Sequence, residues 1–235
     1  VAVGFHFYSR MDHEICRQVQ QTLAKQFPHL NVSVGAARLV EDRGIAIHDL
    51  VISETSANRL QSNLLVVDEM MLDCDVQLTQ LMKGRPAIRR VIVRHPQVWI
   101  SRESDGSFNL GSLWPPPQCG DSPPQILIED ARITLIDRKN PQAVPIALHD
   151  VNLTIQAKAH NAPTDGAMQA RPAIAICEVH GTLGGPHFEE AEFNATCNLA
   201  EQSIIGTGKF TKLKLTKELF SWAQAFGGPQ LAQVE

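Results

Sequence analysis

The stretch IALHDVNLTI, residues 146–155, contains the pattern that decides the fold. Ile146 and Leu148 are separated by one residue, a His-Asp pair follows, and the same apolar spacing then resumes at Val151 and Leu153. On a strand each apolar pair lies on one face, whereas on a helix these positions would scatter around the axis. The two middle residues fit a β-bulge, which accommodates an extra residue without turning the apolar face over. The stretch therefore predicts a bulged strand with one apolar face.

The same pattern occurs at five other places in the 235-residue chain. With 43% hydrophobic residues, chance alone gives roughly two or three such windows in a chain of this length. The observed number is a moderate excess over chance. We interpret the pattern as a repeated β-strand motif, with pairs such as His48-Asp49 and Glu129-Asp130 at the bulges. The other copies begin at Ile45 (IAIHDLVI), Leu65 (LVVDEMML), Val91 (VIVRHPQVWI), Ile126 (ILIEDARITL) and Gly208 (GKFTKLKL, the weakest copy).

Three helices are expected beside the strands. Ser9 precedes a helix over 10–27, which has an apolar residue at every fourth position from Ile15 to Phe27. Asp75 can cap a short helix that ends at Gly84, and Thr216 can cap a final amphipathic helix. The chain thus predicts an N-terminal helix and two short amphipathic helices.

Roughly ten strands account for most of the remaining chain. Parallel pairs need long crossover connections, usually helices, so short connections predict an antiparallel meander. The fold class is therefore mainly β, with a long curved antiparallel sheet. The expected strands are 30–40, 44–53, 63–74, 87–102, 107–110, 125–137, 144–159 and two or three more between 172 and 215.

The apolar faces of these strands need a cover, and three short helices cannot cover ten strands. One solution is a sheet that folds on itself into a sandwich or barrel. The other is a trough whose apolar floor is occupied by an apolar molecule from outside. The residues alone leave both solutions open.

Composition and motifs argue against several functions. The net charge of −4 excludes a typical nucleic-acid binder, which needs clustered Lys and Arg. The five cysteines are odd in number and contain no CxxC, so neither a disulfide framework nor a zinc site is indicated, and no cofactor is expected. Cys177 and Cys197 could pair across strands, although free thiols are the favoured interpretation.

No constellation of residues indicates catalysis, and we predict no catalytic or metal site. The His-Asp pairs at His48 and His149 lack a neighbouring nucleophile, and adjacent strand residues point to opposite faces. Asp105-Gly106 predicts a turn, and the following Asn109 is expected to satisfy nearby backbone groups with its side chain.

The segment IRRVIVRHPQVWISRESDGSFNL, residues 88–110, resembles a characteristic segment of AsmA-like proteins, in which a strand turns through Asp-Gly and returns through Asn-Leu. Residues 126–155 are similar to the strand pair that follows it there. The order of an N-terminal helix, VSVGAARL at 32–39 and GIAIHDL at 44–50 also resembles that family. The resemblance covers about residues 1–215.

This resemblance implies a bacterial envelope protein anchored in the inner membrane, on the periplasmic side. Its sheet would form a groove similar to that of bridge-like lipid transfer proteins, and it would move phospholipid toward the outer membrane or support outer-membrane biogenesis. Residues 1–8 are too short to span a bilayer, which needs about 20 apolar residues. The expected organisation is a membrane-proximal helix at 1–29, the tail of an anchor, a groove domain at 30–215, and a C-terminal helix with the start of a linker at 216–235.

Our first hypothesis is therefore a non-enzymatic lipid-binding or lipid-transfer groove. Its partners would be phospholipid acyl chains, the inner membrane through a preceding helix, and other envelope proteins. The alternative is a closed β-sandwich that serves as a structural or protein-interaction module. The candidate groove residues are Val93, Val98, Ile100, Ile128, Ile133, Leu135, Leu148, Val151, Leu153 and Ile155.

Overall fold

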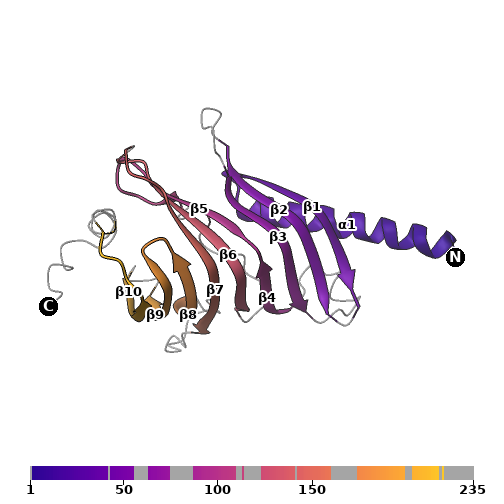
Figure 1. Cartoon of the computed structure of the whole chain (residues 1–235). Coiled ribbons are helices and arrows are strands. Elements are labelled where there is room, and N and C mark those ends of the chain that lie inside the picture. The colour runs from indigo at the N-terminus through magenta and orange to yellow at the C-terminus, as the bar shows by residue number, and fades with distance from the viewer. Residues whose placement is uncertain are drawn as a thin grey trace, which may run out of the picture.

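The computed structural model shows a mainly β chain, with one N-terminal helix and one long mixed sheet (Figure 1). The strands lie side by side in a single layer, and the helix lies against the end of the sheet that the first strands of the chain form. The structure describes residues 2–41, 43–55, 63–74, 87–109, 113, 123–140, 142–159, 174–198, 203–216 and 219.

Helix α1 (Ala2–Gln26) begins well before the predicted first residue and ends one residue before the predicted last one. Its apolar positions at every fourth residue, including Ile15, Val19 and Leu23, pack against the buried core of the first strands. Phe27 follows the helix and is buried in the same cluster. The spacing that predicted the helix thus also determined which side of it packs on the sheet.

Several strand limits agree with the sequence prediction to the residue, namely 30–40, 63–74 and 125–137. The strands are β1 (Leu30–Val40), β2 (Gly44–Glu54), β3 (Asn63–Cys74), β4 (Ile88–Arg94), β5 (Gln97–Arg102), β6 (Gln125–Asp137), β7 (Ile146–Ala159), β8 (Ile174–Gly185), β9 (Phe188–Asn198) and β10 (Ser203–Thr211).

The predicted single strand over 87–102 was wrong, because it is divided into β4 and β5 at His95-Pro96. His95 has a φ of 48°, outside the extended region, and Pro96 has no N–H to donate to a ladder. The predicted return strand at 107–110 was also wrong. Within its described part there is one bridge between Arg102 and Phe108, beyond a turn in which Gly106 N donates to Glu103 O at 2.9 Å.

The sheet is mixed, so the predicted purely antiparallel meander was wrong. The strand order is β1-β2-β3-β4-β6-β7-β8-β9-β10, and β5 lies between β3 and β6. Both β4 and β5 run parallel to β6, because the chain after β5 returns to the level of β4 before β6 begins. The two extra short helices are not confirmed. The one at 75–84 lies outside the described residues, as does the later one apart from Thr216, whose Oγ1 accepts a hydrogen bond from Leu219 N, and Leu219 itself.

Five of the six windows contain a residue with positive φ at the predicted bulge position, and a two-against-one register shift accompanies it at Asp130 and at Asp150. At Asp49 the register continues one to one against both neighbouring strands, so the bulge predicted at His48-Asp49 was wrong. Every non-glycine residue with positive φ in the described chain occupies the fifth position of a window. Asx side chains tolerate this left-handed region better than most. The residues and their φ values are Asp49 (53°), His95 (48°), Asp130 (52°), Asp150 (51°) and Lys212 (54°).

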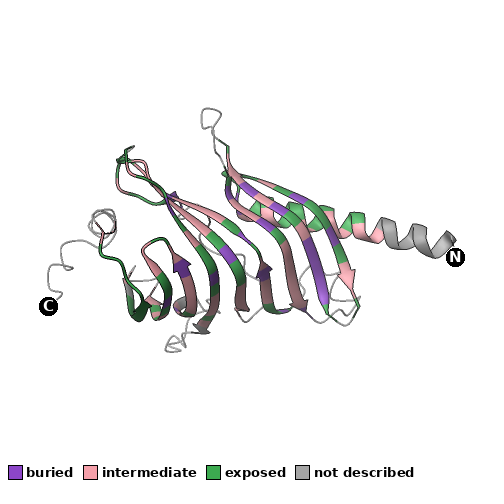
Figure 2. Cartoon of the chain, viewed as in Figure 1, coloured by how far each residue is buried: buried purple, intermediate pink, exposed green. Residues whose placement is uncertain are grey.

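The described strands form one open sheet, in which β1 and β10 are the two edges. A sandwich would need two sheets, and a barrel would need β1 to pair with β10. The buried cluster lies at the α1 end and includes Val34, Ile47, Leu50 and Val67 (Figure 2). One end of the apolar face is therefore covered by the helix.

Candidate functional site: the apolar face of the sheet

The strand register places all ten candidate groove residues on one face of the sheet. Directly paired residues share a face, and Ile128 pairs with Val93 on one side and with Leu153 on the other. The remaining candidates follow from the pairs Val98↔Ile133, Ile100↔Leu135, Ile133↔Leu148, Ala131↔Val151 and Ile126↔Ile155.

Two complementary bulges keep this face continuous across β6 and β7. Between the pairs Ile128↔Leu153 and Ala131↔Val151, β6 has two residues where β7 has only Asn152. On the other side of Ala131, β7 has two residues where β6 has only one. The displaced backbone is satisfied locally, since Asp130 N donates to Asn152 Oδ1 at 3.0 Å. The strands therefore change alternation together, and the apolar side chains stay on the same side.

The apolar face extends beyond the predicted set at both ends. Toward α1 it includes Val34, Leu50 and Val67 by register. Toward β10 it includes Val179 and Phe193. The weak alternation in β8 concealed this continuation, because a glycine at 181 occupies an inward position.

Burial differs along this face (Figure 2). Beneath α1 the side chains are buried, whereas most inward residues of β6 to β9, including Leu153, are only half-buried. Val151 is an exception: its 0% exposure leaves no surface for a lipid to contact, so this candidate groove residue belongs to the buried core. Phe210 at the β10 edge is 52% exposed. Phe210 packs edge-on against Phe188, with ring centroids 5.4 Å apart. Apolar side chains therefore remain partly exposed over β6 to β9.

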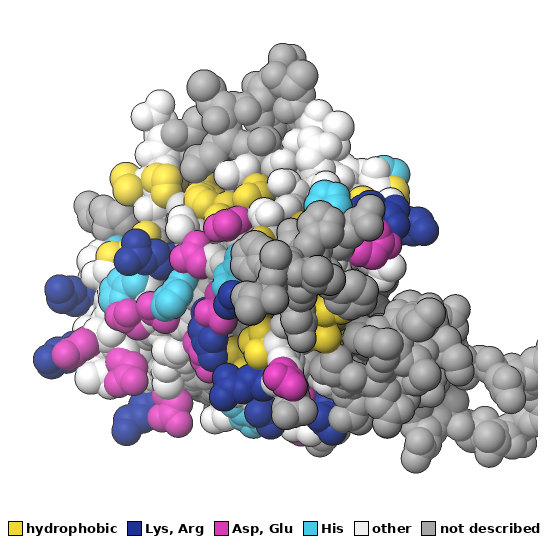
Figure 3. Space-filling view, turned by 90° about the vertical axis from the view of Figure 1, so that its right-hand side faces the viewer, with side chains coloured by type: hydrophobic (Ala, Val, Ile, Leu, Met, Phe, Trp, Pro, Cys, Tyr) yellow, Lys and Arg dark blue, Asp and Glu magenta, His cyan; other side chains and the backbone are white. Residues whose placement is uncertain are grey.

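The opposite face carries charged residues, and charged side chains of both signs gather on one side of the molecule in Figure 3. Arg94 bridges two neighbouring strands, with Glu129 at 2.9 Å and Glu69 at 3.0 Å. Hydrogen bonds to Glu129 and then Glu69 raise the pKa of Arg94. These pairs lie where β4 meets its parallel neighbour β6, so they join the two halves of the mixed sheet.

A shallow hollow of about 400 Å³ crosses β6 to β9. By register most of its lining residues, such as Glu129, His180 and Asn194, belong to the polar face of the sheet. His180 Nδ1 lies 2.5 Å from Asn194 Oδ1 across this hollow. The trough predicted from the sequence had an apolar floor, so this hollow is a different feature.

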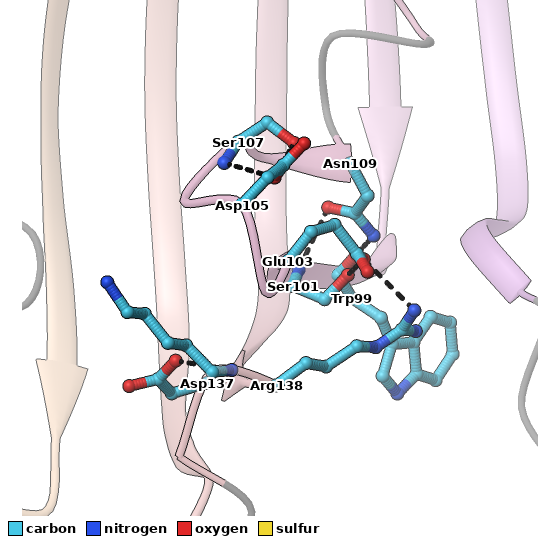
Figure 4. A network of polar contacts seen from close by, with 9 residues as sticks. Trp99, Ser101, Glu103, Asp105, Ser107, Asn109, Asp137 and Arg138 are labelled. Carbon is cyan, nitrogen blue, oxygen red and sulfur yellow. Dashed lines mark hydrogen bonds and ion pairs between the residues drawn. The ribbon is translucent and has the colours of Figure 1, made fainter.

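A buried polar network caps the free edge of β5 (Figure 4). On one side of β5, β3 pairs only with Gln97 and Val98. The backbone groups of the following β5 residues therefore have no β3 partner on that side. Asn109 supplies one: its Oδ1 accepts from Ser101 N at 2.8 Å, and its Nδ2 donates to Trp99 O at 2.9 Å. Glu103 extends the network from Ser101 Oγ to Arg138. The predicted structural role of Asn109 is confirmed.

One expectation about the His-Asp pairs was wrong. Adjacent strand residues were expected to point apart, yet His149 Nδ1 lies 2.8 Å from Asp150 Oδ2. The positive φ of Asp150 turns its side chain out of the normal alternation. Both side chains are exposed.

In the described part of the chain, no group of three or more His, Cys, Asp or Glu residues is arranged to hold a metal ion. No described helix is long and apolar enough to cross a membrane. Comparison with models of known protein families and with curated protein sequences finds no significant match.

Proposed function

We propose that the apolar face of the sheet binds lipid acyl chains, and that the chain is a non-enzymatic lipid-transfer segment of an AsmA-like envelope protein. In this proposal the protein is anchored in the bacterial inner membrane and acts on its periplasmic side. The observation that carries the proposal is one continuous apolar face on an open ten-stranded sheet, half-exposed over β6 to β9.

The dimensions and chemistry of this face suit an acyl chain. Because β4 and β5 share one position between β3 and β6, the sheet is nine strands wide. Strands lie about 4.8 Å apart, so the face is roughly 43 Å wide, against about 30 Å for the hydrocarbon core of a bilayer. Burial of apolar surface contributes about 25 cal/mol per Å², without selecting a particular head group. The half-buried side chains have surface left to bury, and acyl chains would cover it.

The covered end of the face supports the same interpretation. Helix α1 packs over β1 and its neighbours with its own apolar side chains. An apolar partner therefore already occupies one end of the face, and a lipid would act as the equivalent partner farther along.

Site-specific photo-crosslinking in bacterial cells tests the proposal. Crosslinkers at Ile133 and Leu153 should capture phospholipid, whereas crosslinkers at Thr134 and Thr154, the next residues on the opposite face, should not. Each threonine directly follows its apolar partner on the same strand and is half-buried like it, so the two positions differ in the face of the sheet on which the side chain lies. Capture at the threonines alone, or no lipid at any position, would contradict the proposal.

A further inference from the structure

Two cysteines lie directly opposite each other on neighbouring strands. Cys177 of β8 pairs with Cys197 of β9 in the antiparallel register. Opposed residues in such a ladder have Cα atoms about 4.5 or 5.5 Å apart, and disulfides span Cα separations of about 4.4–6.8 Å. The Cα spacing at either kind of ladder position therefore lies within the range that disulfides span.

The surroundings place the two thiols in one apolar environment. Both cysteines are free in the structure, with Cys177 buried and Cys197 half-buried. Ala157 of β7 is the other register neighbour of Cys177. Burial, and secondarily the nearby Cys197, raise the pKa of Cys177, and burial raises the pKa of Cys197. The influence of Cys197 on the pKa of Cys177 is consistent with their opposed positions in the ladder.

We propose that Cys177 and Cys197 form a disulfide across β8 and β9 when the protein is exposed to a disulfide oxidant. This modification site is independent of lipid binding, and neither proposal requires the other. The bond would join the strands at the end of the ladder far from their connecting turn.

The reaction with oxidised glutathione balances in two exchange steps. The more exposed Cys197 loses its proton, and its thiolate attacks one glutathione sulfur, which releases one reduced glutathione and leaves a mixed disulfide. Cys177 then loses its proton and attacks the Cys197 sulfur, which releases the second glutathione. Two thiols are oxidised, one glutathione disulfide is reduced, and the protein loses two hydrogen atoms. The raised pKa values leave little thiolate at neutral pH, so exchange in the folded chain is slow.

Peptide mapping tests the proposal directly. A glutamate-specific protease separates the two cysteines into peptides 130–178 and 193–201, whereas trypsin has no Lys or Arg to cleave between them. The full chain is treated with oxidised glutathione, both folded and during refolding from denaturant in a glutathione redox buffer. Remaining thiols are alkylated before digestion without reductant. The refolding arm removes the effect of slow access to buried thiols.

We expect the two peptides to be recovered as one crosslinked species in the refolding arm. Cys177→Ala and Cys197→Ala should each abolish it, whereas Cys119→Ala should leave it unchanged. Oxidation should also raise the melting temperature of the wild-type chain, a shift that reductant reverses and that both alanine variants lack. Recovery of both peptides alkylated from a correctly folded chain would overturn the proposal, as would glutathione retained on Cys197 or a link to another cysteine.

Discussion

Gly35 of β1 lies under the side chain of Asp49 of β2, so closely that a Cβ on residue 35 would lie 2.7 Å from the Asp49 Cβ. Asp49 adopts a positive φ of 53° at the point where the alternation of β2 changes. The register of β1 and β2 continues on both sides of this point, from Val34↔Leu50 to Ala36↔His48. The glycine therefore provides the space that lets both strands change alternation together.

The first prediction concerns this pair. Gly35→Ala should lower the free energy of unfolding by about 1–3 kcal/mol, the usual range for overpacking. Asp49→Gly removes the three atoms that would lie nearest to the new methyl group and retains access to positive φ. Urea unfolding of the wild type, both single variants and the double variant measures the coupling. An equal cost of Gly35→Ala in both backgrounds would show that the contact with Asp49 is not the cause.

Asn109 is predicted to stabilise β5 through its two backbone hydrogen bonds. Asn109→Ala leaves Ser101 N and Trp99 O without this partner in a buried location, which costs about 1–3 kcal/mol for each group left unsatisfied. Asn109→Asp should retain the bond from Ser101 N but place an acceptor against Trp99 O. Thermal unfolding of both variants should show clear destabilisation, with the exposed turn substitution Ser104→Ala as the control. A loss no larger than that of the control would contradict the capping role.

Substitutions at Val151 and Leu153, on the same strand, should have different effects on stability and on lipid binding. Val151 is 0% exposed, so Val151→Ala should cost about 1.5–3 kcal/mol through lost burial and a new cavity. Leu153 is half-buried, so Leu153→Ala should lower the free energy of unfolding by less per atom removed than Val151→Ala does. It should, however, weaken lipid binding.

Urea titration gives the stabilities, and native mass spectrometry of the purified chain gives the bound lipid. If Val151→Ala reduces lipid retention at temperatures where it is fully folded, and Leu153→Ala does not, the assignment of contact residues is wrong.

Arg94 is predicted to have a small, salt-dependent effect. The Arg94 side chain is 38% exposed between Glu69 and Glu129, so Arg94→Met should change the free energy of unfolding by no more than about 1 kcal/mol. The effect should decrease as the salt concentration rises, because ions screen exposed charges. Arg90→Met, on the same strand and face, is the comparison. A loss of several kcal/mol that is insensitive to salt would mean that the bridge behaves as a buried one.

Local patterns were sufficient for most of the strand limits and for the facing of the candidate residues. Alternation with a period of two places a residue on one face regardless of what the strand pairs with, and a polar pair within that alternation marks the bulge. This is why the limits of β3 and β6, and the shared facing of Ile133 and Leu153, follow from the sequence. The hydrogen bonds of Asn109 likewise follow from a turn only a few residues long.

Contacts between segments that are far apart in the sequence could not be predicted from these local patterns. Whether β6 runs parallel or antiparallel to β4 depends on the path of the connection between β5 and β6, which alternation does not encode. The position of Cys177 opposite Cys197 depends on register, which is determined by the whole β8–β9 ladder. The sequence by itself could specify each strand and its apolar side, because these depend on neighbouring residues. Only the folded chain determines which strands meet, where α1 covers the face, and which part of it stays open, because these depend on packing across the whole sheet.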